Sequence, residues 1–299
     1  MTNYLELYTK FLVKFLKPKK NLRVVFDSSN GTTGLVIGKL KALVGDKLEM
    51  ILINDQPDGD FPAHGPDPLQ PGATDQLAAA IKKHQADLGV IFDSDGDRAF
   101  FVDNRGRLLI PDTAIILLAE NFKGSTLLTI NIGMLAREHF AREKRKVYDS
   151  RVGHYFVKQI LLGKKVPFGA EPSGHYYFKD FFYADSGILS SLFFINSVSR
   201  LETSLSEWLD ALPRYYRSGE VNFKISRPKE EVLRVMEEVM MPRKPKVSKL
   251  DGIRMDFNDW WCMVRASNTE PLIRLNVEAK DKKVFEKELA FLSELLSQK

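Results

Sequence analysis

Short apolar runs and longer amphipathic stretches alternate along the first two thirds of the chain. Short apolar runs predict buried strands, and apolar residues three or four positions apart predict helices. The predicted strands cover residues 22–26, 48–53, 88–92, 99–103, 125–131, 146–150 and 165–170. The predicted helices cover residues 34–45, 74–85, 134–145 and 152–162, and another begins near Gly187. Nearly continuous apolar strands between helices are typical of sheets that helices cover on both faces.

This alternation restarts once and then changes, which predicts three domains. The repeated rhythm indicates two consecutive α/β domains with mixed sheets, at 1–105 and 106–214. From residue 215 the order becomes strand, helix, three strands and helix, which indicates a small α+β C-terminal domain at 215–299.

The elements of this last domain are individually clear. Strands are predicted at 220–225, 247–257, 260–266 and 272–279, and helices at 229–240 and 283–296. The turn at Asn258–Asp259 predicts a hairpin over residues 250–265.

The N-terminal stretch 4–15 predicts an amphipathic helix. One helical stripe carries the apolar residues Tyr4, Tyr8, Phe11, Leu12 and Phe15, and it is interrupted by Glu6, Lys10 and Lys14. This pattern indicates a helix that docks on a domain, and neither a secretory signal nor a membrane span. Since no other run approaches the length of a bilayer-crossing segment, we expect no membrane partner.

Composition narrows the class of protein further. With 44% hydrophobic and 28% charged residues the chain is typical of globular proteins. Its single cysteine, Cys262, excludes an internal disulfide and a cysteine-cluster metal site, which suits a cytoplasmic location. The net charge of +5 includes basic clusters at 17–20, 142–146 and 242–246. They lack interleaved aromatic residues, so solvated surface charge is favoured over nucleic-acid binding, and a basic chain also suits an anionic small substrate.

The stretch DSDGDR at 93–98 places three carboxylates directly after a predicted buried strand. In open α/β sheets, ligands collect beyond the carboxyl ends of strands. Asp93, Asp95 and Asp97 would point the same way on an extended backbone, and Gly96 lets the loop curl around an ion. Carboxylate oxygens with no His or Cys nearby favour a hard cation, Mg²⁺ before Ca²⁺.

Two other interpretations of this loop exist. An EF-hand that starts at Asp93 would need its invariant glycine where the chain has Arg98, and its bidentate glutamate where it has Asn104. The EF-hand therefore fails at both positions. An Asp-rich turn that holds no ion remains the alternative.

Three further loops contain candidate binding residues. The stretch GAEPSGH (169–175) places Glu171, Ser173 and His175 at alternate positions, as recognition of a polyhydroxyl ligand requires, or as in an ordinary polar turn. The stretch RASNTEPLIR (265–274) resembles an anion cradle, or a hairpin loop with two exposed arginines. Its donors are Arg265, Ser267, Asn268, Thr269 and Arg274. In RVGHYFVK (151–158), His154 opens a helix that carries Lys158 one turn later, and a structural role for His154 is favoured.

Together with PDGDFPAHGPDP (57–68), these loops in this order resemble the α-D-phosphohexomutases, and the phosphomannomutase/phosphoglucomutase branch in particular. The resemblance covers nearly the whole chain. It implies that Asp93, Asp95 and Asp97 hold Mg²⁺ and that Arg98 lies beside the reacting phosphate. It also implies contacts with a mannose or glucose 1- or 6-phosphate. The sugar-hydroxyl contacts would be Glu171 and Ser173 with His175 nearby, the phosphate contacts Arg265, Ser267, Asn268, Thr269 and Arg274, and further substrate contacts His154 and Lys158.

The chain departs from the family in two places. The family's first domain carries a phosphorylated serine in a TASHNP-like loop, and this chain has no Ser-His dipeptide. Gly133 stands where some members carry a lysine. The resemblance therefore implies a mutase body that needs a phosphoserine domain, on a separate polypeptide or removed by an engineered boundary.

Three functions remain open at this point. The chain is a mutase body, or a shortened paralogue that binds sugar phosphates without chemistry, or a nucleic-acid binder that uses its basic clusters. The mutase interpretation requires the aspartate trio and the arginine-rich hairpin to face a shared cleft.

Overall fold

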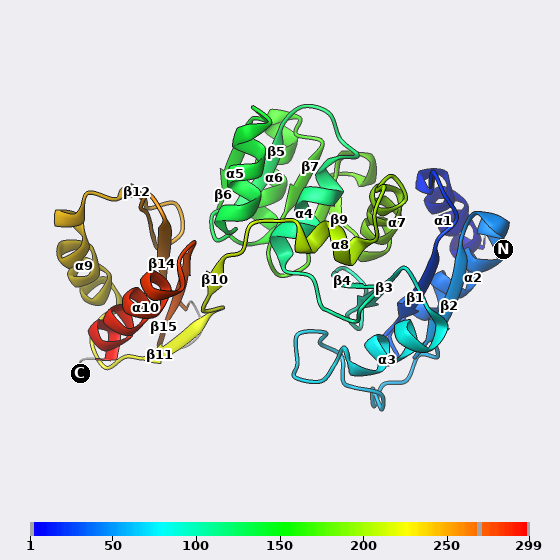
Figure 1. Ribbon diagram of the computed structural model, residues 1–299, viewed down its shortest axis with the longest axis horizontal. Helices are drawn as coiled ribbons and strands as arrows, with labels where there is room; N and C mark the ends of the chain where they lie inside the picture. Colours follow the sequence, from blue (N-terminus) through cyan, green and yellow to red (C-terminus); the bar gives the residue numbers. More distant parts are fainter. Residues whose placement is uncertain (1–2, 268–270, 298–299) are drawn as a thin grey trace. The chain divides into compact units, whose positions relative to one another are not determined.

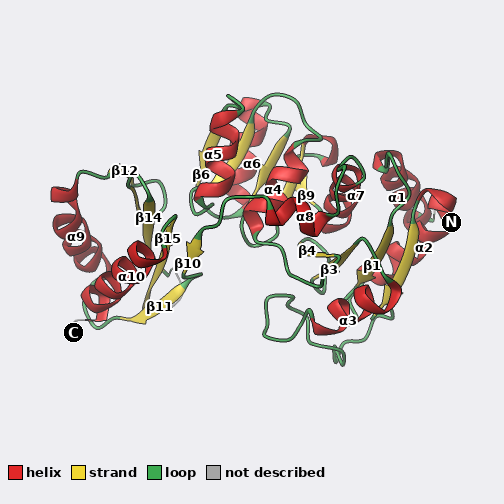
Figure 2. Cartoon of the chain, in the orientation of Figure 1, coloured by secondary structure: helices red, strands yellow, loops and turns green. Residues whose placement is uncertain are grey.

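The computed structural model describes residues 3–267 and 271–297, and Figures 1 and 2 show its helices and strands. The chain forms two compact units. The first unit contains Met1–Leu127 and Lys158–Leu212, and the second contains Leu128–Val157 and Pro213–Lys299.

The first sheet has the strand order β2-β1-β3-β4. Its strands are β1 (Arg23–Asp27), β2 (Glu49–Ile53), β3 (Leu88–Phe92) and β4 (Ala99–Asp103). The first three are parallel and β4 is antiparallel to β3, so the sheet is mixed. The accompanying helices are α1 (Tyr4–Leu12), α2 (Thr33–Val44) and α3 (Asp75–His84). Leu77 and Ile81 of α3 pack on the buried apolar face of these strands, as their four-residue spacing requires.

The second sheet has the order β6-β5-β7-β8-β9. Its strands are β5 (Thr126–Thr129), β6 (Val147–Ser150), β7 (Phe168–Ala170), β8 (Tyr176–Phe178) and β9 (Ala184–Asp185). Its helices are α4 (Pro111–Ala119), α5 (Met134–Arg142), α6 (His154–Lys164), α7 (Gly187–Val198) and α8 (Leu205–Asp210). Phe194 of α7 stacks on Phe101 of β4 with ring centroids 3.8 Å apart, which fixes α7 against the first sheet.

The third sheet is antiparallel and belongs to the C-terminal part of the chain (Figure 2). Its strands are β10 (Tyr216–Arg217), β11 (Val221–Lys224), β12 (Lys246–Ser248), β13 (Ile253–Asp256), β14 (Trp260–Ala266) and β15 (Leu272–Ala279). Helices α9 (Lys229–Met240) and α10 (Lys282–Ser297) cover its apolar face with residues such as Met236 and Leu292. Short 3-10 helices lie at Val13–Phe15, Gly45–Lys47, Lys179–Phe181 and Met241–Arg243.

The predicted fold class, two α/β domains with mixed sheets and then a small α+β domain, is confirmed. Strands β13 and β14 form the predicted hairpin, but the strand predicted at 247–257 is two strands, because the backbone turns at Gly252 with φ +70°. Helix α4 was not predicted, because Asp112–Ala119 are buried on every side and show no amphipathic period. Among the helices of the described residues, none combines the length and the hydropathy that a bilayer crossing needs.

A buried polar cluster fastens the long loop 54–73 to the carboxyl end of the first sheet. The fully buried carboxylate of Asp27 accepts hydrogen bonds from Asn54 Nδ2 at 3.1 Å, and its Oδ2 lies 3.2 Å from Nε2 of His64. The hydrogen bond with Asp27 raises the pKa of His64, although desolvation opposes it. Because the pKa is raised in the folded protein, this contact stabilises fully below pH ~6.5 and the stabilisation fades as the pH rises through the folded-state value.

Replacing His64 with glutamine is therefore expected to destabilise the protein more at low pH than at high pH. We expect a loss of about 1–2 kcal/mol at pH ~5.5 and a smaller loss at pH ~8.5. The urea midpoint of parent and variant at both pH values measures it, with His84→Gln at the end of α3 as the control. An equal loss at both pH values would contradict the assignment.

Candidate active site

The acidic loop begins where the fully buried strand β3 ends and is organised by its first carboxylate. Asp93 is 2% exposed, and its Oδ1 accepts hydrogen bonds from the backbone N–H groups of Gly96 and Arg98, both at 3.1 Å. Its Oδ2 accepts a 2.5 Å bond from Nε of Arg98. Gly96 has φ +75°, and a Cβ there would lie 2.0 Å from Cγ2 of Thr33, so only glycine fits. The loop is thus a tight turn and not an extended segment.

Three carboxylates gather on this turn. One oxygen of each of Asp93, Asp95 and Asp97 lies within 4.8 Å of the other two. Nη1 of Arg98 also lies 3.5 Å from Oδ1 of Asp67, so one guanidinium faces three acidic side chains, those of Asp67, Asp93 and Asp97. Burial raises the pKa of Asp93, although the hydrogen bond from Arg98 opposes this effect. Excess negative charge on hard oxygen ligands fits a divalent cation, and the three aspartates could hold a metal ion.

The second loop joins β7 to β8 and contains a buried carboxylate. Glu171 is 2% exposed, and its Oε1 accepts a 2.5 Å hydrogen bond from the hydroxyl of Tyr177. Burial, followed by the charge of Glu171, raises the pKa of Tyr177 well above its usual range, so this tyrosine stays a hydrogen-bond donor. Ser173 is half-buried in the same loop. Backbone bonds from Glu171 N to His175 O and from Gly174 N to Glu171 O close the loop into a turn.

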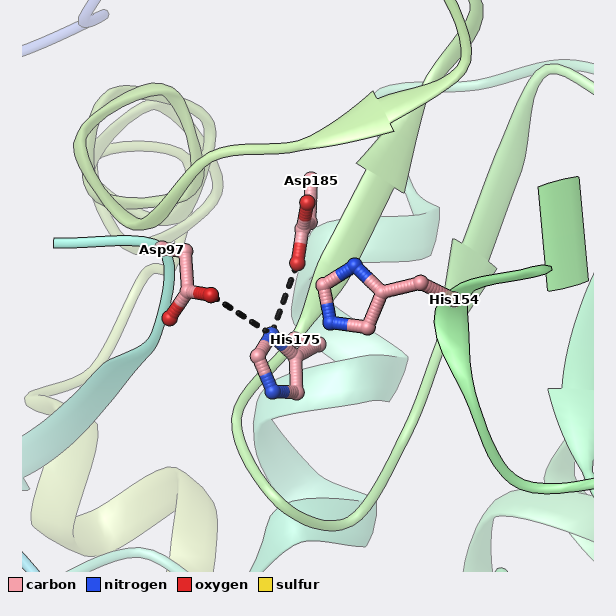
Figure 3. A group of neighbouring side chains, drawn as sticks. All are labelled: Asp97, His154, His175 and Asp185. Carbon is pink, nitrogen blue, oxygen red and sulfur yellow. Dashed lines mark hydrogen bonds and ion pairs between the residues drawn. The ribbon is translucent and has the colours of Figure 1, made fainter. Parts of the chain in front are cut away.

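His175 connects the two loops. Its Nδ1 lies 2.7 Å from Oδ2 of Asp185 and 3.8 Å from Oδ2 of Asp97, as Figure 3 shows. Desolvation lowers the pKa of His175, but the hydrogen bond to Asp185 and the charge of Asp97 outweigh it, so the pKa is raised. Oriented by Asp185, the ring can donate a proton or a hydrogen bond.

The backbone also holds the loops together. Ala99 N donates to Gly174 O, and Gly187 N at the start of α7 donates to Gly96 O, both at 3.1 Å. A Cβ on Gly187 would lie 2.5 Å from the carbonyl oxygen of Arg98, so this approach requires glycine. The first unit therefore brings together the predicted residues Asp93, Asp95, Asp97, Arg98, Glu171, Ser173 and His175.

The remaining predicted residues belong to other segments of the chain. His154 is the first residue of α6 and is drawn in Figure 3, and Lys158 follows one turn later; both are exposed. In the second unit, Arg265 of β14 and Arg274 of β15 are direct partners across the antiparallel ladder. Ser267 is buried, and its carbonyl oxygen accepts a hydrogen bond from Nζ of Lys229. Asn268 and Thr269 lie outside the described residues.

Sequence reasoning missed several side chains that organise the site. Asp67 lies in one of the stretches that carry the resemblance and Asp185 lies beyond them, and their contacts with Arg98 and His175 span 31 and 10 residues. Nothing in the sequence distinguishes Tyr177, the donor to Glu171, from an ordinary strand residue. Gly133 is the N-cap of α5, where Met134 N donates to Glu278 of the C-terminal domain at 2.6 Å.

Comparison with known proteins accounts for this arrangement. Three family models match the chain in sequence. They describe phosphoglucomutase/phosphomannomutase alpha/beta/alpha domain II at residues 3–106, alpha/beta/alpha domain III at 111–216 and the C-terminal domain at 220–295. The chain belongs to the phosphoglucomutase/phosphomannomutase family.

Individual relatives of the phosphoglucomutase/phosphomannomutase family match over most of the chain. A phosphomannomutase of Methanocaldococcus jannaschii is 34% identical over 301 residues, which cover 99% of this chain and 66% of the relative. A phosphomannomutase of Escherichia coli K12 is 36% identical and covers 90% of this chain and 60% of the relative. A solved family structure from Burkholderia thailandensis is 25% identical, with a TM-score of 0.84 over 98% of this chain and 64% of that one. The chain thus spans less than two thirds of the length of these relatives.

Proposed function

We propose that this chain is the body of a phosphohexomutase that interconverts hexose 1-phosphates and 6-phosphates of mannose or glucose. The observation that supports this proposal best is the contact between the two loops. His175, in the loop of Glu171, lies close to Asp97 of the acidic loop and is held by Asp185. Such a site combines a cation position, an arginine and a buried carboxylate acceptor, which are the groups that a phosphorylated sugar needs. Family membership supports the same reaction class.

Each group of residues has a proposed task. Asp93, Asp95 and Asp97 would hold Mg²⁺, which supplies charge neutralisation to a phosphoryl group. Arg98, held by Asp93, orients that phosphoryl group, and His175 is held in place by Asp185 for hydrogen bonding or proton transfer. Glu171 and Ser173 bind sugar hydroxyls.

The second phosphate-binding group lies in the C-terminal domain. Arg265, Ser267, Asn268, Thr269 and Arg274 bind the phosphate that is not transferred, and the two arginines supply its charge-assisted hydrogen bonds. His154 and Lys158, at the exposed start of α6, add contacts with the same substrate. We also propose the division into domains at 1–105, 106–214 and 215–299.

Turnover in this proposal needs a phosphoserine, and the chain would receive it from another domain or polypeptide. Phosphoryl transfer depends on positioning and on charge stabilisation of the phosphoryl group, so a body without its donor is expected to be nearly inactive. A coupled assay of glucose 1-phosphate conversion to glucose 6-phosphate, with a longer family member as positive control, tests this. Robust conversion by the chain alone would contradict the need for a donor. Failure to bind hexose phosphates at millimolar concentration would contradict the proposed function.

A further inference from the structure

A glutamate side chain of the C-terminal domain already pairs with the two arginines of that domain, Arg265 and Arg274. Arg265 and Arg274 are directly opposite each other on β14 and β15, and like charges in such positions repel. Glu220, which follows β10 and precedes β11 in the chain, is an acidic side chain that pairs with both arginines. Its Oε2 is 3.3 Å from Nη2 of Arg265 and its Oε1 is 3.1 Å from Nη1 of Arg274. A single carboxylate therefore bridges both guanidinium groups.

This bridge leaves donors of the pair unused. Nε of Arg274 is buried and has no hydrogen-bond partner within residues 3–267 and 271–297. The other nearby carboxylate, Asp251, is 3.7 Å from Nη1 of Arg265, but it already accepts a 3.2 Å bond from the backbone of Val152. A planar carboxylate with two oxygens thus matches the arginine pair incompletely, whereas a tetrahedral phosphate offers further oxygen atoms and more charge.

We propose that Glu220 is a resident counterion that the phosphate of the ligand must displace, and that it thereby selects phosphate over carboxylate ligands. The inference rests on the proposed function for the identity of the ligand. An exchange of one carboxylate for another brings no net electrostatic gain, so a sugar acid binds poorly. A phosphate monoester carries more than one negative charge at neutral pH and outcompetes the resident group.

Because Glu220 is partly exposed, its displacement by a ligand requires little free energy. Its side chain is 37% exposed, so the released carboxylate can turn into water. Ion pairs at such exposed positions contribute about 0–1 kcal/mol each, which is far less than a desolvated pair would cost to break. The carboxylate of Glu220 therefore weakens ligand binding to the two arginines but does not prevent it.

The variant Glu220→Gln keeps the side-chain shape and removes the charge. We expect calorimetry to show roughly five- to tenfold tighter binding of glucose 6-phosphate and of inorganic phosphate to the variant than to the parent. Glucuronate, a sugar that carries a carboxylate and no phosphate, is expected to bind measurably to the variant only. Glu238→Gln makes the same charge change in an exposed ion pair with Arg234 on α9 and serves as the matched control.

The outcomes separate the inference from the proposed function. If Glu220 instead orients the arginines, Glu220→Gln weakens phosphate binding, and the inference is overturned. Unchanged affinity, or an equal gain in Glu238→Gln, overturns it as well, while glucose 6-phosphate binding to the parent keeps the proposed function intact. If neither the parent nor the variant binds any phosphate ligand, the inference and the proposed function are both contradicted.

Discussion

Replacing Arg274 with alanine is expected to weaken glucose 1-phosphate binding by about 1–3 kcal/mol, or roughly 5- to 150-fold in Kd. Within the described residues its buried Nε has no hydrogen-bond partner and its Nη1 pairs with the partly exposed Glu220, so we expect a ligand phosphate to take these donors. Inorganic phosphate is expected to lose affinity by a similar factor. Isothermal titration calorimetry of parent and variant measures both losses.

Loss of folding does not explain this result, because removal of one arginine relieves repulsion across the β14–β15 ladder. The urea midpoint of Arg274→Ala is therefore expected to equal or slightly exceed that of the parent. Arg234→Ala removes an exposed arginine from α9 of the same domain and is the matched control. Equal affinity of Arg274→Ala and the parent would show that the hairpin does not bind phosphate.

Replacing Glu171 with glutamine is expected to weaken glucose 1-phosphate binding about tenfold or more and to leave inorganic phosphate binding unchanged. A buried carboxylate accepts hydrogen bonds from hydroxyls more strongly than an amide does, and only the sugar ester offers ring hydroxyls. The contrast between the two ligands separates sugar recognition from phosphate recognition. Calorimetry with both ligands on the same preparation measures it.

Tyr177→Phe provides the control for this experiment. It removes the hydroxyl that donates to Glu171 but retains the carboxylate, and Tyr177 itself is 1% exposed. We expect a loss in stability with a smaller loss in sugar affinity than for Glu171→Gln. If Glu171→Gln weakens both ligands equally, or neither, Glu171 is not a sugar contact.

Much of the fold could be predicted because its signals are local. Strands β3, β4, β14 and β15 and helix α9 have their predicted bounds, since apolar period and turn residues define them. Helix α4 shows where this reasoning fails, because a helix buried all round has no polar face to reveal its period. The strand predicted at 247–257 failed because Gly252 allows a backbone turn that the apolar pattern does not show.

The sequence predicted which residues form the candidate site better than it predicted how these residues are arranged. Asp93, Asp95 and Asp97 converge through a turn closed by Gly96 and Arg98, not through an extended backbone. Local sequence cannot show which distant groups complete a site. The pairing of Asp67 with Arg98, and of Glu220 with the two arginines, depends on tertiary contacts between loops that are far apart in sequence.

The central claim is that the loops of Asp93 and Glu171 and the arginine pair of the C-terminal domain act on one sugar phosphate. A crystal structure of the chain with bound glucose 1-phosphate tests it most directly. The account predicts one ligand molecule whose phosphate contacts Arg265 and Arg274 and whose hydroxyls contact Glu171 and Ser173. A ligand that engages only one of these groups, with the other facing a separate surface, would contradict it.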